Sequence, residues 1–431
     1  MKTCIQPAFR VLSIAIHAVL AIFPARPAAA ATPAELSVVV DVPTDEGRCV
    51  PVRAEIDLPA DLAKLPAEKI LATLTDAAGK SVAGQVVRDG DKAQLWWVLP
   101  QAAAGKSRWT ARLSQGDYAG KDTFSFQDTP GKHLDLLFDG KGVTRYMYEC
   151  DASTPEKAKE TNKVFTHVFD ETGKDFITKG AGGHDPHHRG IFIGWSRLTV
   201  GTARYDFWGM GGGTQIHRKF VETSAGPVLG RMVAQIDWVD KQGKTVLTEQ
   251  RTTTCFRQDA PGLMLMEFAT KLTAGGEDIL LTGDPEHAGF QFRAHNDVAV
   301  AAGAAGGSQT SNKAPEDLKT TYEFHADGIK TPGQKLDNNK DLPWAAMCYA
   351  LRGKRYYVEH MNCPANPKGT IYSAYRPYGR FGAYFVAPIK AGQTLPLVYR
   401  VYAAAGTMPA REQLSQRAAA FTEMPKAAAA R

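Results

Sequence analysis

The sequence predicts an all-β protein, in which a large antiparallel β-sandwich follows a small N-terminal immunoglobulin-like β-sandwich domain. Short apolar runs with strand-like alternation recur from residue 35 onward, and turn residues separate them. Helical patterns are brief, the clearest being the run from Pro409 to Phe421. The chain of 431 residues is long enough for two domains that each bury a core.

The N-terminus has the order of a secretory signal peptide, which we place at residues 1–31. Lys2 and Arg10 precede an apolar stretch from Val11 to Phe23, and four alanines follow at Ala28–Ala31. We therefore expect an exported protein, periplasmic or extracellular. The apolar stretch is short for a membrane span, and no later segment offers about twenty consecutive apolar residues, so we expect no stable membrane insertion.

The composition gives little sign of a nucleic-acid partner. Removal of residues 1–31 would take away Lys2, Arg10 and Arg26 and no acidic residue, which lowers the formal net charge from +6 to +3. The basic residues are scattered rather than gathered in a stripe with aromatic residues. We therefore expect no nucleic-acid binding, and the sequence does not indicate an oligomeric state.

The strand-like runs divide the chain behind the leader into two domains. Residues 32–130 contain six short runs typical of a small sandwich, and residues 131–425 continue the pattern as the larger β-sandwich that would carry the functional site. Residues 426–431 are expected to form a disordered tail. The six runs of the first domain are 36–42, 50–56, 70–74, 94–99, 107–113 and 123–126.

The segment from His184 to Gly190 is the first candidate for chemistry. It places His184, His187, His188 and Arg189 in one short loop, directly before the strand-like run 191–195. A loop next to a rigid strand can bring neighbouring side chains to one place, whereas a strand would point them to opposite faces. A single histidine here could equally be structural, so the prediction depends on the whole cluster.

The segment from His287 to His295 predicts a second part of the same site. Polar His287, Gln291 and Arg293 alternate with apolar residues, which is typical of a half-buried strand. Imidazole, amide and guanidinium groups on one face suit the binding of carboxylates or sugar hydroxyls. Gly289 in mid-strand leaves room for another group to approach the backbone.

Two further regions contribute candidate binding residues. Asp206 and Trp208 precede a glycine run that leads to His217, and we interpret this stretch as the rim of a pocket. A strand ending at His360 and the loop behind it, with Asn366, lead to a segment rich in tyrosine and arginine. The candidates of that last segment are Tyr372, Arg376 and Tyr378.

Several of these segments together resemble a family of exported bacterial proteins called PmoA-like or "methane oxygenase PmoA". The resemblance covers roughly residues 133–425 and implies a sandwich of the galactose-mutarotase or polysaccharide-lyase type, in proteins that occur with sugar-degrading enzymes. At Cys363–Asn366 this chain departs from the His-Pro-x-Asn pattern of the family. The segments that carry the resemblance are 186–190, 206–208, 216–217, 366–367 and 376–379.

Our leading hypothesis is a carbohydrate-active enzyme that acts on an oxidised sugar, uronic or keto, by proton abstraction followed by elimination or epimerisation. A base near neutrality and cationic donors for the developing negative charge are the groups that such a reaction needs. The hypothesis uses no cofactor. The catalytic candidates are His187, His188, Arg189, His217, Arg293 and Tyr372, and the substrate-binding candidates are Asp206, Trp208, His287, Gln291, His360, Asn366, Arg376 and Tyr378.

Three alternatives stay open from the sequence. A divalent metal held by His184, His187, His188 and His217 would make a hydrolytic or oxidative centre. Glu249 and Glu267 could form a glycosidase pair, although a buried ion pair of Glu249 with Arg251 explains the same residues. A noncatalytic glycan-binding protein would use the same aromatic and amide groups without turnover.

Overall fold

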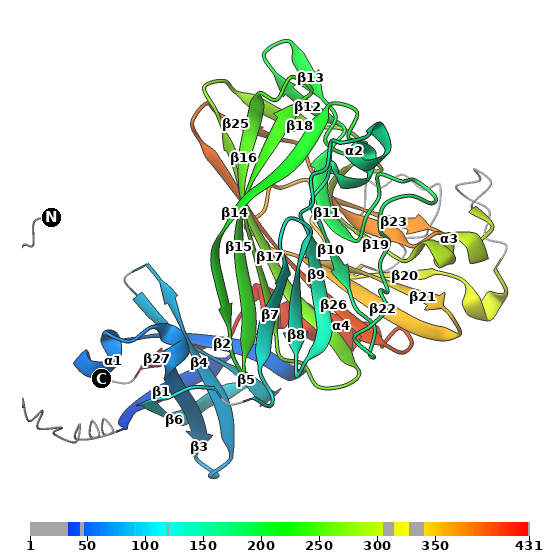
Figure 1. The fold of residues 1–431 in the computed structure, drawn as a ribbon. Coiled ribbons are helices and arrows are strands. Elements are labelled where there is room, and N and C mark those ends of the chain that lie inside the picture. Colours follow the sequence, from blue (N-terminus) through cyan, green and yellow to red (C-terminus); the bar gives the residue numbers. More distant parts are fainter. Residues whose placement is uncertain are drawn as a thin grey trace, which may run out of the picture.

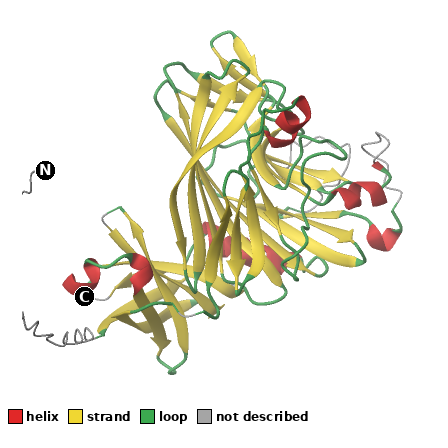
Figure 2. Ribbon diagram, viewed as in Figure 1, coloured by secondary structure: helices red, strands yellow, loops and turns green. Residues whose placement is uncertain are grey.

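The computed structural model is dominated by strands, which form four antiparallel sheets, and its helices are short (Figure 2). The prediction of an all-β fold with a large β-sandwich is confirmed. The signal peptide predicted at residues 1–31 lies outside the residues that the structure describes. The described residues are 33–43, 47–90, 92–118, 120–304, 314–326 and 340–429.

The N-terminal domain is built on a seven-stranded sheet with the order β2-β5-β4-β3-β6-β1-β27 (Figure 1). In β1 every second residue from Val38 to Val42 is buried, as the period of a strand with one core face requires. Two short helices, α1 (Ala60–Ala63) and η1 (Ala67–Lys69), lie between β2 and β3. The strands are β1 (Ala34–Val42), β2 (Gly47–Ile56), β3 (Ile70–Asp76), β4 (Ser81–Asp89), β5 (Lys92–Ala102), β6 (Gly105–Gln115) and β27 (Lys426–Ala429).

Three details of this domain differ from the prediction. Its strands form one curled sheet around a shared core, rather than the two separate sheets of an immunoglobulin-like sandwich. The expected tail at 426–431 is wrong for Lys426–Ala429, because this segment pairs with β1 as strand β27. The boundary expected at residue 130 is also too late, because β7 (Phe124–Thr129) already belongs to the larger domain. Alanine-rich termini carry no apolar alternation, so the pairing of β27 was not visible in the sequence.

The larger domain consists of two eight-stranded sheets and a four-stranded extension. The first large sheet has the order β23-β24-β19-β11-β10-β9-β8-β7, and the second has the order β14-β15-β16-β17-β26-β22-β21-β20. The strands of the first sheet that follow β7 along the chain are β8 (His133–Phe138), β9 (Lys141–Met147), β10 (Phe165–Val168), β11 (Ile191–Trp195), β19 (Ala288–Arg293), β23 (Ile371–Arg376) and β24 (Arg380–Tyr384).

The second large sheet contains the longest strands of the described chain, and the four-stranded sheet extends beyond its end (Figure 1). The second sheet comprises β14 (Gly213–Ala225), β15 (Leu229–Asp240), β16 (Thr245–Phe256), β17 (Gly262–Ala274), β20 (Thr321–Phe324), β21 (Trp344–Leu351), β22 (Lys354–Asn362) and β26 (Thr394–Ala405). The four-stranded sheet comprises β12 (Arg197–Val200), β13 (Ala203–Tyr205), β18 (Ile279–Thr282) and β25 (Ala387–Ile389).

The helices of the larger domain connect or cover strands, and they are α2 (Pro155–Thr161), α3 (Asn296–Ala301), η3 (Glu316–Leu318) and α4 (Arg411–Thr422). Helix α4 packs on the second large sheet with Leu414 and Phe421, in a cluster that also holds Trp96 of the N-terminal domain. The two domains therefore share apolar contacts. None of the helices in the described ranges has the length and apolar character of a membrane span.

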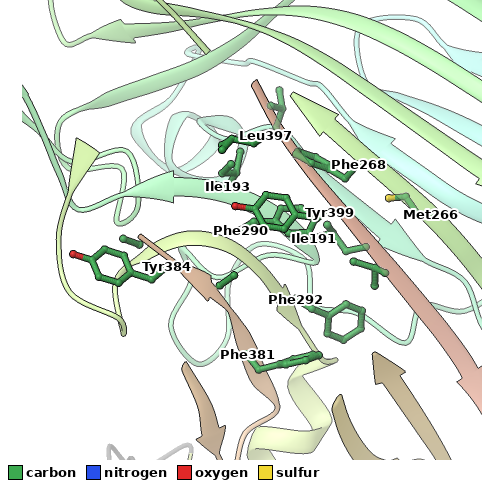
Figure 3. Close-up of a cluster of buried hydrophobic side chains, with 14 of the residues drawn as sticks. Ile191, Ile193, Met266, Phe268, Phe290, Phe292, Phe381, Tyr384, Leu397 and Tyr399 are labelled. Carbon is green, nitrogen blue, oxygen red and sulfur yellow. The ribbon is translucent and has the colours of Figure 1, made fainter. Parts of the chain in front are cut away.

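The core of the sandwich lies between the two large sheets. Phe290 and Phe292 of β19 point into it and meet residues of the second sheet such as Phe268 and Tyr399 (Figure 3). Because side chains alternate along a strand, Gln291 and Arg293 must point to the other face of the first sheet, away from this core. That outer face carries the candidate site.

Candidate functional site

Three arginines stand side by side on the outer face of the first large sheet. Arg293 of β19 is directly opposite Arg380 of β24, and Arg380 is directly opposite Arg376 of β23. All three side chains are almost fully buried. Like charges directly opposite one another on neighbouring strands destabilise a sheet, so this row needs compensation from other groups.

The protein compensates this row only in part. Arg376 forms an ion pair with Glu286, at 2.7 Å. Arg380 donates Nη1 to Gln291 Oε1 at 3.0 Å, and Arg293 donates Nη1 to the backbone carbonyls of Ala294 and Tyr378. Arg293 Nε and Nη2 and Arg380 Nε are buried and have no hydrogen-bond partner among the described residues. Burial lowers the pKa of Arg293 to about 10, which reflects a charge that its surroundings do not fully satisfy.

The loop predicted from the sequence lies against this row and brings two imidazoles to one carboxylate. Asp185 Oδ2 lies 3.3 Å from His184 Nε2 and 3.4 Å from His188 Nδ1. Asp185 has a left-handed backbone, with φ of 50°, which aspartate tolerates better than most residues. Both nitrogens of His188 are buried without a hydrogen-bond partner in the described chain, and burial holds its pKa well below 6.5. His188 is therefore a neutral imidazole that lies beside the Asp185 carboxylate without a hydrogen bond to it.

Two buried lysines fix this loop through backbone carbonyls. Lys179 Nζ donates to the carbonyls of Gly180 and His188, both at 3.1 Å, and also to those of Gly182 and Asp185. Burial lowers the pKa of Lys179 to about 7.

Lys163 donates to the carbonyls of His187, at 2.9 Å, and Trp208, at 2.5 Å, and so joins the histidine loop to the next loop along the chain. Burial also holds its pKa well below the usual value. Burial thus lowers the pKa of both ammonium groups, which lie beside the arginine row.

Trp208 closes the cluster from the loop that follows β13. Its ring centroid lies 5.5 Å from that of His188 and 5.5 Å from the guanidinium carbon of Arg380. Its Nε1 is buried and finds no acceptor among the described residues. Asp206 does not face a ligand directly, because its Oδ1 accepts hydrogen bonds from the backbone of Trp208 and Gly209. Asp206 thus positions the tryptophan.

Tyr378 and His287 complete the cluster on two sides. The ring of Tyr378 lies 4.8 Å from His184 and 6.3 Å from His188, and the guanidinium of Arg293 lies 4.6 Å above it. His287 is half-exposed at the rim, where its ring lies 6.5 Å from that of Trp208. The three segments that the sequence predicted to converge, namely the histidine loop, β19 and the hairpin β23–β24, therefore lie together.

Arg189 does not act at this cluster. Its guanidinium donates to the carbonyls of Lys159 and Glu160 at the end of α2, at 2.5 and 2.9 Å, and to Asn162 Oδ1. Cations near a helix C-terminus satisfy its unpaired carbonyls. The catalytic role predicted for Arg189 is therefore wrong, and the residue anchors α2 beside the loop.

His217 lies away from the predicted site. Its ring packs against Tyr148 and Phe220, with centroids 4.7 and 4.4 Å apart, near the edge of the second sheet. The predicted catalytic role of His217 is therefore wrong, and so is the four-histidine metal set.

His360 and Tyr372 lie on the inner faces of the sheets, inside the core. Tyr372 donates to the carbonyl of His360 at 3.0 Å, and His360 packs against Phe290 and Tyr399. Tyr372 is directly opposite Ala383 on the inner face of the first sheet, because a register irregularity between Ala374 and Arg376 shifts the alternation along β23. His360 faces the same core from β22 of the second sheet. Their predicted roles in catalysis and binding are wrong.

Asn366 is a structural residue of its loop. Its amide donates to Asn362 Oδ1 and to the carbonyl of Val398, and its oxygen accepts from the amide of Val398, all at 2.7 to 2.9 Å. These partners belong to the end of β22 and to β26. Substrate binding by Asn366 is therefore not supported.

The two glutamates proposed as a glycosidase pair lie on opposite faces of the second large sheet. Glu249 faces the core, where it accepts from Arg251 at 2.7 Å and from Trp238 at 2.8 Å. Glu267 faces outward and pairs with Arg400 at 2.9 Å. The ion pair of Glu249 with Arg251 is confirmed, and the glycosidase pair is wrong.

Within the described ranges, one group of side chains has metal-ligand spacing, and it is not the histidine loop. Asp284, Glu286 and His287 have ligand atoms within 4.8 Å of one another, at the rim of the cluster. Glu286 is bound by Arg376, and His287 Nδ1 lies 2.8 Å from Asp284 Oδ1. This ion-pair arrangement explains the three residues without a cation.

Sequence reasoning missed three cationic members of the cluster: Lys163, Lys179 and Arg380. The two lysines stand in ordinary polar surroundings in the sequence, and nothing marks them as buried. Arg380 had a usable signal, because Arg376 and Arg380 flank the turn Pro377–Gly379. In a tight hairpin such flanking residues face each other across the two strands.

Taken together, the cluster places a neutral imidazole beside several buried N–H donors that have no hydrogen-bond partner among the described residues. The model of one protein family, described as a family of unknown function (DUF6807), matches residues 133–419, which contain every residue of the cluster. No curated protein matches the chain.

Proposed function

Because the chain belongs to the DUF6807 family, whose function is unknown, we propose its function from the chemistry of its own site. We propose an exported carbohydrate-active enzyme that removes a proton next to the carboxylate or carbonyl group of an oxidised sugar, uronic or keto. Elimination or epimerisation then follows. In this proposal His188 is the base, Asp185 orients it, and Arg293 and Arg380 bind the negative charge.

The observation that carries the proposal is the set of buried donors without partners on one face of the sheet. Arg293 Nε and Nη2, Arg380 Nε and Trp208 Nε1 all lack a hydrogen-bond partner in the described chain. An unmade hydrogen bond of a buried group costs about 1–3 kcal/mol, and more for a charged group. A bound carboxylate or enolate would satisfy several of these donors at once, and planar guanidinium groups suit such oxygens.

The base is placed for proton abstraction by its neutral state and its neighbour. Burial keeps His188 unprotonated, and the carboxylate of Asp185 lies 3.4 Å from its Nδ1. Nε2 is then the nitrogen that accepts the substrate proton, and the Asp185 carboxylate stabilises the imidazolium that forms. Hydrogen bonds of this kind are often long in a free enzyme and shorten in the substrate complex.

The electrons can be followed through both outcomes. The C–H pair moves toward the carboxylate or carbonyl oxygens as His188 takes the proton, and the arginines stabilise the resulting enolate. In elimination, the enolate forms a C=C bond and expels the oxygen on the next carbon, which takes a proton from Tyr378. In epimerisation, a proton returns to the opposite face of the same carbon. We assign the proton donor to Tyr378 because its ring faces both His184 and His188.

Export and the sugar substrate rest on the sequence. The leader at residues 1–31 supports export, and the resemblance to PmoA-like proteins supports a carbohydrate substrate. Arg376 and Gln291 support the site from its edges, since they hold Glu286 and Arg380 in place.

The experiment that tests the proposal follows the abstracted proton itself. Oligomers of glucuronate, galacturonate and mannuronate, and 3-keto glucosides, are incubated with the protein in D2O and monitored by NMR. Loss of the proton next to the carboxylate or carbonyl reports both elimination and epimerisation, and ultraviolet absorbance identifies the unsaturated product. We expect exchange with at least one of these classes, and we expect His188→Ala to slow it by at least about 100-fold.

The control is His325→Ala, because His325 is an exposed histidine far from the cluster in sequence, and this change should leave the rate unaltered. Full activity of the His188→Ala variant would refute the assigned base. Binding of these sugars without any exchange would favour the noncatalytic alternative. A metal-dependent mechanism predicts loss of exchange after dialysis against EDTA, whereas the mechanism proposed here predicts none.

A further inference from the structure

A second candidate site lies on the opposite side of the sandwich from the histidine loop. A cavity of about 400 Å³ opens where the N-terminal domain, the second large sheet and α4 meet. Its floor is the outer face of the second sheet, and its walls come from β2, from α4 and from the loop before β17. This volume is within the range of small-molecule sites, which measure about 300–1,000 Å³.

Helix α4 turns a polar stripe toward the cavity. Gln413, Gln416, Arg417 and Ala420 line it and follow the spacing of one helix face. The opposite stripe of the helix, with Leu414, is buried against the sheet. Gln413 and Gln416 are exposed, so their amides can donate to and accept from a ligand in the cavity.

The two arginines at this cavity both have carboxylate partners, unlike Arg293 and Arg380 of the arginine row. Arg417 donates to Glu359 at 2.5 Å, and Arg400 pairs with Glu267 at 2.9 Å. Asp259 adds a further carboxylate to the lining. With no excess of positive charge, the cavity has no reason to select an anion, and a neutral polar ligand suits it better.

Two tyrosines give the cavity its aromatic surface. Tyr402 and Tyr357 line the floor with ring centroids 5.8 Å apart. The guanidinium carbon of Arg417 lies 3.9 Å above the ring of Tyr402 and fixes its orientation. Tyrosines combine an apolar face with a polar end, and placed amides add directional hydrogen bonds. We propose that this cavity binds a neutral saccharide unit, as a site separate from the one that carries His188.

This inference does not depend on the reaction proposed above, and its test excludes the other site. The full chain carrying Arg380→Met, which removes one cation of the arginine row, is titrated with the methyl glycosides of glucose, galactose, mannose and xylose, while saturation-transfer NMR records binding. We expect saturable binding of at least one neutral glycoside. The double change Gln413→Ala and Gln416→Ala removes both amides and should raise the dissociation constant of that glycoside at least 10-fold. Alanine preserves the helix, so the variant should stay folded.

The matched control is Glu412→Ala, an exposed change on the same helix at a position outside the cavity lining, which should leave binding unchanged. Absence of saturable binding for all four neutral glycosides would overturn the proposal. So would equal affinity in the double variant.

Discussion

Arg293 and Arg380 face each other directly across β19 and β24, and neither guanidinium forms an ion pair with a carboxylate in the described part of the chain. Gln291 and backbone carbonyls accept some of their hydrogen bonds, and other N–H groups have no acceptor. A fold that served stability alone would place apolar residues or a salt bridge at these positions. The pair therefore has the character of a preformed anion site.

The first prediction concerns Arg380→Met. Removal of one of two facing buried charges should leave the free protein as stable as before, or stabilise it by about 1 kcal/mol, because like-charge repulsion and desolvation are relieved. The same change should abolish stabilisation by an anionic ligand. A ligand at 100 times its dissociation constant adds about 2.7 kcal/mol to the free energy of unfolding. Thermal unfolding with and without glucuronate measures both effects.

The control for that experiment is a neutral glucoside, whose effect on the melting temperature should be the same in the wild type and in Arg380→Met. An equal rise with glucuronate in the wild type and in Arg380→Met would contradict the assignment of the arginine row as an anion site.

The second prediction concerns a buried arginine that has a carboxylate partner. Arg251 binds both oxygens of Glu249 at 2.7 and 3.0 Å in the core. Arg251→Met leaves that carboxylate buried without its counter-ion, which should cost about 3–5 kcal/mol. Urea unfolding measures the change. The exposed pair of Arg218 with Asp237, at 2.8 Å, is the comparison, and Arg218→Met should cost less than about 1 kcal/mol. An equal loss in the free energy of unfolding for Arg251→Met and Arg218→Met would show that burial does not decide how much each ion pair matters.

Much of the fold could be predicted from the sequence because alternation is a local property. The run from His287 to His295 identifies β19 and its polar face, and the structure places Gln291 and Arg293 on that face. The close approach at Gly289 was expected, but its source was not: a Cβ there would collide with the carbonyl oxygen of Ala383 on the next strand. The sequence therefore predicts which face of a strand a side chain occupies, whereas strand pairing decides which residues of the next strand lie beside it.

The wrong predictions for the candidate site also arise from contacts between distant parts of the chain, which a local sequence pattern does not encode. His360 and Tyr372 are polar residues that point inward, where Tyr372 donates a hydrogen bond to the carbonyl of His360. Periodicity around them does not reveal this, since strands buried on both faces lack a clear alternation. Lys163 and Lys179 act through backbone carbonyls of a loop, and such contacts depend on loop geometry that no residue pattern encodes.

The third prediction is a pH dependence of stability that His167 contributes. His167 is buried against Phe176, and burial lowers its pKa to about 3 from the ordinary 6.5. Between these values the unfolded chain binds a proton that the folded protein excludes, so the free energy of unfolding falls as pH falls below 6.5. His167→Phe keeps the stacked ring and should reduce this slope by about 1.4 kcal/mol per pH unit near pH 5.

Urea unfolding at pH 8 and at several pH values down to 4 gives this slope. At pH 8 the variant should lose only about 1 kcal/mol, from the hydrogen bond to Thr178 at 3.0 Å. Parallel stability curves for the wild type and the variant would rule out this contribution. His325→Phe, at an exposed position, serves as the control for histidine removal.

The last prediction tests whether Lys179 holds the histidine loop in place. Its ammonium donates to four carbonyls between Gly180 and His188, so Lys179→Met should release the loop while the sheets stay folded. With a net value of about 1 kcal/mol for each hydrogen bond, and partial replacement by water, local opening should become easier by about 2–3 kcal/mol. Amide exchange of peptides covering 180–190 should then accelerate by roughly 30- to 150-fold. Peptides from β16 should keep their protection, and exposed Lys174→Met should leave both regions unchanged.

Unaltered exchange in the loop would show that backbone contacts alone hold it, whereas equal acceleration in β16 would mean that Lys179 supports the whole domain. Faster exchange confined to the loop would mean that Lys179 helps to keep His188 and Asp185 in the geometry that proton abstraction needs.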